Sequence, residues 1–224
     1  MLRPKKKITK KEIQRDPFLE TVDQAQAHLE ENRSKYLQYG ILLLALLIGY
    51  NVISNNSSKR SVEASSALGD ALLTLDMNDQ TTAQFQLENV VNEYSNTVSA
   101  SLAEYYLGKM SYDSNNLVEA GRYVKSYLNA SPRGFLAPSA GILLADITAN
   151  SGNFRDAISI LDKCINDTNS KKDLKLLKLR KAEFELLDGQ KSIAKDIIDE
   201  LLTDDELSTW NKQIAQEIMG KVVS

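Results

Sequence analysis

Residues 101–134, SLAEYYLGKMSYDSNNLVEAGRYVKSYLNASPRG, decide the fold of this protein. Two stretches with apolar side chains at helical spacing flank the polar pair Asn115-Asn116, which favours a turn. Ala120 lies near the start of the second stretch, and Gly108 lies twelve residues before it in the first. Because paired helices approach closely only where side chains are short, these two positions predict a tightly packed helix pair.

The same pattern recurs through the chain with a period of 37 residues. One column is alanine throughout, a second column twelve residues earlier is alanine or glycine, and a third column four residues later is apolar. These columns are Ala83, Ala120, Ala157 and Ala194; Ala71, Gly108, Ala145 and Ala182; and Leu87, Val124, Leu161 and Ile198. Turn residues separate the first two columns at Asn78-Asp79, Asn115-Asn116, Ser151-Gly152-Asn153 and Asp188-Gly189. A repeat of this length predicts stacked helix pairs, an α-solenoid of about four units.

These units resemble the tetratricopeptide repeat (TPR). The unit at 101–134 supplies a leucine-glycine pair, a tyrosine, an alanine, an apolar residue and a closing proline: Leu107-Gly108, Tyr112, Ala120, Val124 and Pro132. The next unit supplies Leu144-Ala145 and the phrase GNFRDAISIL at 152–161. We therefore expect an all-α protein with a TPR-like domain over residues 62–206. A C-terminal capping helix is expected over residues 207–224, with Trp210, Ile214 and Ile218 facing the last repeat.

The apolar segment LQYGILLLALLIGYNVI at residues 37–53 predicts a single transmembrane helix, placed at 36–54. Seventeen helical residues span about 25 Å, which is short for a hydrocarbon core of about 30 Å, but flanking tyrosines extend the usable length. A cleaved signal peptide is disfavoured because the preceding region is long and contains six acidic residues. A buried helix of a soluble domain is disfavoured because the segment is apolar all round. Residues 55–61 are expected to form a linker.

Charge is distributed unevenly along the chain. Residues 1–36 hold nine of the 27 Lys and Arg residues and six of the 30 Asp and Glu residues, which leaves 18 basic and 24 acidic residues downstream. A basic arm at residues 1–35 suits an anionic membrane surface and, by the positive-inside rule, a cytoplasmic N-terminus. An RNA-binding interpretation of its lysines lacks the interleaved aromatic residues that it would need.

The sequence contains no constellation that would run a reaction. One histidine, His28, and one cysteine, Cys164, cannot form a metal cluster or a supported nucleophile-base pair. Cys164 falls on the apolar seam after Ala157 and Leu161 and is interpreted as a core residue. We expect no catalytic residue, no metal, no cofactor and no enzymatic activity.

A solenoid of this kind offers a concave surface for proteins, lined by the first helix of each unit. The repeat register predicts groove residues at Tyr105, Lys109, Tyr112, Ser139, Ile142, Asp146 and Glu183. Tyr105 and Tyr112 are seven residues apart on one helix face, where they either contact a partner or pack against the neighbouring repeat. The sequence leaves both readings open.

The whole arrangement also resembles the YfgM-like ancillary subunits of the bacterial Sec translocon, which combine a short cytoplasmic N-terminus, one membrane helix and a periplasmic TPR domain. The resemblance implies an inner-membrane protein with a periplasmic repeat domain. It implies partners among translocon subunits, chaperones or exported clients. We expect neither nucleic acid nor a small-molecule substrate as a partner. The alternative is a scaffold subunit of another cell-envelope complex, in division, wall synthesis or secretion.

Overall fold

The computed structural model describes residues 32–223, except for the side chains of residues 33, 34, 36, 37, 40, 45 and 47–56. The chain divides into two compact units, Met1–Ser58 and Lys59–Ser224. The helices are α2 (Arg33–Asp76), α3 (Gln80–Glu93), α4 (Val98–Asp113), α5 (Leu117–Ala130), α6 (Ala137–Ala149), α7 (Phe154–Asp167), α8 (Lys171–Leu187), α9 (Lys191–Leu202) and α10 (Thr209–Val223). Residues 32–223 contain no β-strand.

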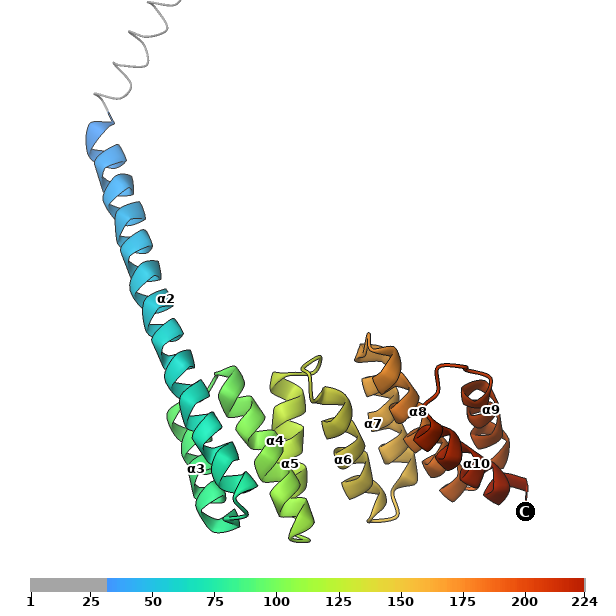
Figure 1. The fold of residues 1–224 in the computed structure, drawn as a ribbon. Coiled ribbons are helices and arrows are strands. Elements are labelled where there is room, and N and C mark those ends of the chain that lie inside the picture. Colours follow the sequence, from blue (N-terminus) through green and yellow to red (C-terminus); the bar gives the residue numbers. More distant parts are fainter. Residues whose placement is uncertain (1–31, 224) are drawn as a thin grey trace, which may run out of the picture. The chain divides into compact units, whose positions relative to one another are not determined.

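The second unit is a stack of helix pairs closed by one further helix (Figure 1). The pairs are α4–α5, α6–α7 and α8–α9, and each pair contacts the next. Residues of α2 beyond position 59 form a first pair with α3, because Leu68 and Ala71 share a buried cluster with Leu87 and Val90. The expected solenoid of four helix pairs is therefore confirmed.

All three 37-residue columns lie in the core. The alanines of the Ala83 column are fully buried, and the residues of the Ala71 and Leu87 columns are buried as well. Gly108 shows why one column needs short side chains, since a Cβ atom there would lie 2.5 Å from Cγ2 of Val124 on the next helix. The small residues set how closely the two helices of a unit approach, and the larger apolar residues fill the seam beside them.

The predicted turns repeat with the same period. Asn78, Asn115, Gly152 and Gly189 are spaced by 37 residues, and each has a positive φ, between 59° and 84°. At three of these turns the following amide donates to the carbonyl five residues earlier: Asp79 to Thr74, Asn116 to Ser111 and Gln190 to Glu185. This hydrogen bond is typical of an α-helix that ends in a residue with the left-handed backbone conformation, and glycine and asparagine are the usual residues at that position.

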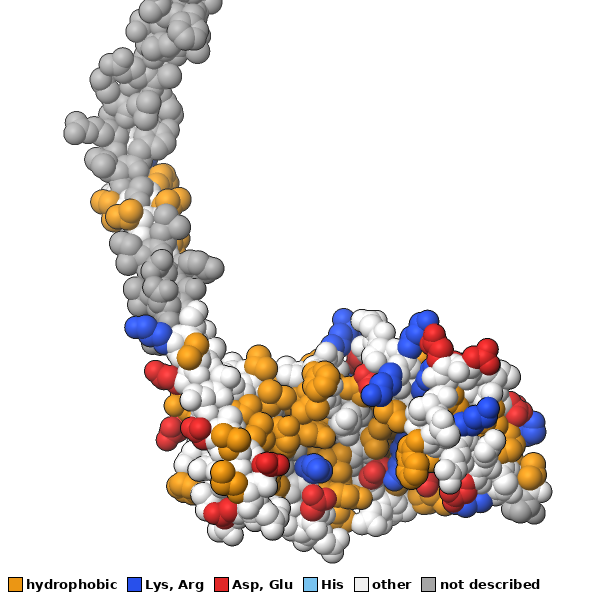
Figure 2. Space-filling model, viewed as in Figure 1, with side chains coloured by type: hydrophobic (Ala, Val, Ile, Leu, Met, Phe, Trp, Pro, Cys, Tyr) orange, Lys and Arg blue, Asp and Glu red, His pale blue; other side chains and the backbone are white. Residues whose placement is uncertain are grey.

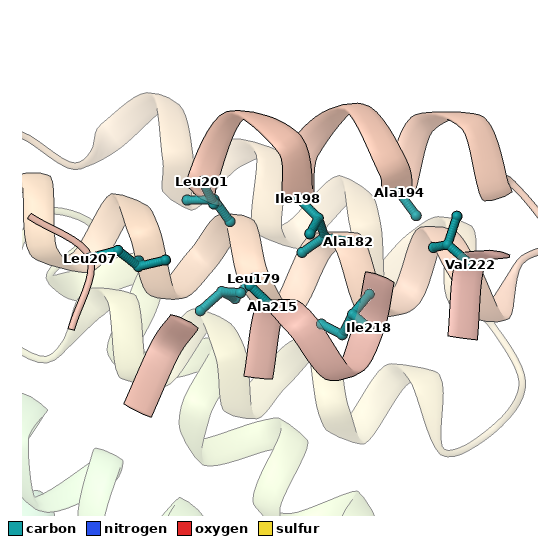
Figure 3. Close-up of a cluster of buried hydrophobic side chains, with 9 residues drawn as sticks. All are labelled: Leu179, Ala182, Ala194, Ile198, Leu201, Leu207, Ala215, Ile218 and Val222. Carbon is teal, nitrogen blue, oxygen red and sulfur yellow. The ribbon is translucent and has the colours of Figure 1, made fainter. Parts of the chain in front are cut away.

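The capping helix forms as α10 and closes the last pair over a buried cluster (Figure 3). Its buried stripe is Asn211, Ala215, Ile218 and Val222, with Ile214 half-buried beside it. The expectation that Trp210 faces the last repeat is wrong, because its side chain is 70% exposed. Trp210 lies about 100° around the helix from the centre of that stripe.

The expected linker at residues 55–61 is helical and belongs to α2. This segment, NNSSKRS, is polar but contains neither glycine nor proline, so nothing in it ends a helix. Among the described residues, no helix combines the length and the apolar character that a membrane crossing requires. Many side chains of the predicted span at 36–54 lie outside the described residues, as do residues 1–31 of the predicted arm with His28.

Candidate protein-binding site

A cleft of about 530 Å³ lies where three repeat units meet, at the ends of α4, α6 and α8. Each of these is the first helix of its pair, which is the helix expected to line the concave surface. Its lining residues are Tyr112, Asp113, Asn115, Leu117, Asp146, Ala149, Asn150, Phe154, Arg180, Phe184 and Leu187. Figure 2 shows one face of this unit, on which hydrophobic side chains gather over the middle helices with charged side chains among them.

Arg180 organises the charges of this cleft. Its Nε donates to Oδ1 of Asp146 at 2.6 Å, and another guanidinium nitrogen donates to Glu183. The guanidinium carbon also lies 4.8 Å from the ring centroid of Phe184, within cation–π range. Two carboxylates and one aromatic face thus hold the Arg180 side chain in a single place.

The two partners of the Arg180–Asp146 pair respond differently to burial. Burial raises the pKa of Asp146, and the hydrogen bond from Arg180 only partly offsets this effect. Burial also acts to lower the pKa of Arg180, but Asp146 and Glu183 outweigh it and the pKa is raised. Of the two partners, Asp146 bears the larger cost of desolvation.

Tyr105 packs between repeats. It is half-buried, its ring centroid lies 5.7 Å from that of Tyr127 on α5, and it packs against a buried cluster that includes Ala140 on α6. Burial raises the pKa of its phenol. These contacts fit the packing interpretation of Tyr105, whereas Tyr112 lines the cleft.

The other predicted groove residues fall into two groups. Tyr112 and Asp146 line the cleft, and Glu183 joins it through Arg180. Ile142 packs against the buried cluster of α6, α7 and α8, while Lys109 and Ser139 are exposed. A binding role for all seven residues stays a prediction.

Sequence reasoning missed Arg180 and the aromatic pair Phe154–Phe184, whose ring centroids are 6.2 Å apart. A signal for this row was present in the repeat register. Asp146 and Glu183 are 37 residues apart, and each directly follows a small residue of the core column, Ala145 or Ala182. Such residues lie on one row along the solenoid, and an arginine within one turn of that row is placed to reach both acids.

Cys164 is half-buried and packs beside the core cluster of α6, α7 and α8, as its place on the apolar seam predicted. It lies so close to Gly141 that a Cβ atom there would be 2.3 Å from its sulfur. Burial raises the pKa of the thiol. The cysteine therefore contributes to helix packing in its neutral form.

Comparisons with known proteins agree with this architecture. The similar solved structures include the "kinesin light chain nearly identical TPR-like repeats" of Podosopora anserina and a point variant of the same repeats. Each has a TM-score of 0.53 and 14% sequence identity, over 72% of this chain and 93% of that chain, a likeness that shows the fold alone. A comparison with curated proteins finds no match. The sequence profile of the tetratricopeptide repeat-like domain matches residues 26–175. The chain therefore belongs to the tetratricopeptide repeat-like domain family.

Proposed function

We propose that this protein is a membrane-anchored binding protein that docks partner proteins on the concave side of its repeat domain. TPR-like repeats are typical of protein-interaction scaffolds rather than enzymes. The observation that carries the proposal is the cleft between α4, α6 and α8, because three separate repeat units contribute side chains to it. A surface built across repeats suits an extended partner segment rather than a small molecule.

The anchor is supported by an exposed apolar run in α2. The side chains of Tyr39, Ile41 to Leu44 and Leu46 are between 59% and 66% exposed. Aliphatic side chains that gain so little burial within their own chain favour an apolar surrounding. The uncharged sequence from Gly40 to Tyr50 and the basic residues upstream support a membrane helix with a cytoplasmic N-terminus.

The proposed setting is the bacterial inner membrane beside the Sec translocon, with periplasmic chaperones or exported proteins as partners. This part rests on the resemblance to the YfgM-like ancillary subunits. An anchor would confine the domain to two dimensions and raise its effective concentration at membrane partners, so that modest contacts in the cleft would suffice.

Photocrosslinking in intact membranes tests both parts of the proposal. A photoreactive phenylalanine analogue replaces Tyr112 in the cleft, and a matched control variant carries it at Lys195, exposed on α9. We expect the Tyr112 variant alone to capture translocon subunits, chaperones or exported proteins. Capture of division or wall-synthesis proteins instead would favour the alternative scaffold. Equal, background capture at both positions would refute a binding role for the cleft.

Protease protection in sealed membrane vesicles tests the topology separately. In inverted inner-membrane vesicles the repeat domain should resist added protease until detergent opens the vesicles. Digestion of the domain without detergent would place the repeats on the cytoplasmic side and exclude a role with periplasmic proteins.

A further inference from the structure

The cleft between α4, α6 and α8 carries more negative than positive charge. The charged residues that line it are Asp113, Asp146 and Arg180, and Glu183 adds a third carboxylate through its contact with Arg180. Three acids therefore lie with one base, and a second base, Lys221 on α10, interacts with Glu183 from outside the lining. The same sign holds for the whole unit Lys59–Ser224, which has 24 acidic and 18 basic residues.

Arg180 is already engaged with acidic partners inside the protein. Its Nε bonds to Asp146, another guanidinium nitrogen bonds to Glu183, and its face lies over the ring of Phe184. An incoming carboxylate could use only the N–H groups that remain, chiefly on Nη2, and would lie beside two acids already in place that repel it. The carboxylates have capacity left, since each accepts from Arg180 and has further lone pairs.

The apolar part of the cleft suits a side chain with an aliphatic stem. Tyr112 and Phe154 contribute aromatic surface from two different helices, and Leu117 and Leu187 add aliphatic surface, whereas Phe184 is only 3% exposed beneath Arg180. Lysine and arginine combine such a stem with a terminal cation that can lie against aromatic faces. A volume of about 530 Å³ leaves room for one such side chain and for part of the backbone that carries it.

We propose that this cleft binds a lysine or arginine side chain of an extended partner peptide, with the stem against Tyr112 and the cation beside Asp146 and Glu183. The inference rests on the proposed function and deepens it by stating which partner segments the cleft selects. The acidic surface of the unit would add long-range attraction for basic segments. Acidic segments would be rejected by the same charges.

Three matched peptides test this selectivity. They are a fluorescein-labelled SLAYKLAYKS, a neutral form with both lysines replaced by glutamine, and an acidic form with both replaced by glutamate. Binding to the full chain in phosphatidylcholine nanodiscs is measured by fluorescence anisotropy, with empty nanodiscs as the baseline. We expect the basic peptide to bind about tenfold more tightly than the neutral one, and the acidic one most weakly.

Variants locate the preference in the cleft. Asp146→Asn and Glu183→Gln should each reduce the ratio of basic-peptide to neutral-peptide affinity to about threefold or less. The control Asp199→Asn removes one acid from α9, the second helix of its pair, and should keep the full ratio. Glu183 is the more exposed of the two cleft acids, at 40% against 18%, so its variant keeps the test valid if Asp146→Asn fails to fold.

The outcomes separate this inference from the proposed function. Equal binding of all three peptides, or a basic preference that survives both cleft variants, would overturn the inference and leave the protein-binding role standing. Tightest binding of the acidic peptide would overturn it as well. If no peptide binds, the inference fails on its own, and the crosslinks at position 112 decide the broader function independently.

Discussion

Replacing Gly108 by alanine should destabilise the repeat domain. The added Cβ would lie 2.5 Å from Cγ2 of Val124 and 3.2 Å from its backbone nitrogen. The methyl group can move by rotation of the side chain, but the nitrogen can recede only if α4 and α5 separate by a few tenths of an ångström. Overpacking of this kind costs about 1–3 kcal/mol, and alanine recovers about 0.5–1 kcal/mol through its better helix propensity. We expect a net loss of about 1–2 kcal/mol.

Urea unfolding of the full chain in mild detergent, followed by circular dichroism at 222 nm, measures this loss. The matched control is Gly69→Ala in α2, where an added Cβ meets no atom within 4 Å and should stabilise the domain by about 0.5–1 kcal/mol. In a Val124→Ala background the cost of Gly108→Ala should fall only in part, because the clashing methyl group is gone but the backbone nitrogen of residue 124 still lies 3.2 Å from the added Cβ. If Gly108→Ala matches the wild type, close helix approach does not explain the glycine.

Three further predictions follow from individual residues. Asn115→Gly should keep or raise the stability and Asn115→Ala should lower it by about 1 kcal/mol in the same urea assay, because Asn115 has φ 59°; equal stability of both variants would exclude a left-handed requirement. Burial raises the pKa of Asp146 in the folded protein. The free energy of unfolding of the wild type should therefore fall relative to that of Asp146→Asn as pH rises from about 4, where the unfolded carboxyl begins to ionise. A difference in free energy of unfolding that does not change with pH would contradict this. Cys164 should react with Ellman's reagent at pH 8 at least about tenfold more slowly than a cysteine peptide and at the peptide's rate in urea, since its thiol is half-buried with a raised pKa; fast reaction in the folded protein would argue against its packing role.

The fold could be predicted from the sequence because the same structural requirement recurs at the same position in each repeat unit. Ala83 alone would be one alanine among many, but Ala120, Ala157 and Ala194 at the same register identify a buried contact. The exposed Trp210 could not be placed in this way. It lies in the capping helix, which occurs once, so no second unit indicates which of its faces is buried.

The candidate site could be predicted only in part, because its geometry depends on contacts between units. The register placed Asp146 and Glu183 on the concave side, and both take part in the Arg180 network. It could not show that Arg180 lies between them, since the choice of partner for a long, flexible arginine depends on the crossing of α6 and α8. It also could not separate Tyr105 from Tyr112, because helical spacing gives a direction but not the distance to the neighbouring helix.

Core residues and cleft residues of this solenoid are adjacent in the sequence. This adjacency suggests how the fold can keep its core while the residues that face a partner vary. Ala145 and Ala182 are fully buried, whereas Asp146, one place after the first, lines the cleft, and Glu183, one place after the second, pairs there with Arg180. Rotation by about 100° per residue carries the chain from a position that allows only short side chains to one that tolerates many. Lys109 follows Gly108 in the same way and carries the opposite charge. The charge at the exposed Lys109 can therefore change without disturbing the seam, whereas Asp146 is 18% exposed and paired with Arg180. Partner selectivity in this domain should accordingly follow the residues after the small column, and Lys109→Glu should alter which peptides bind while leaving the helix pairs intact.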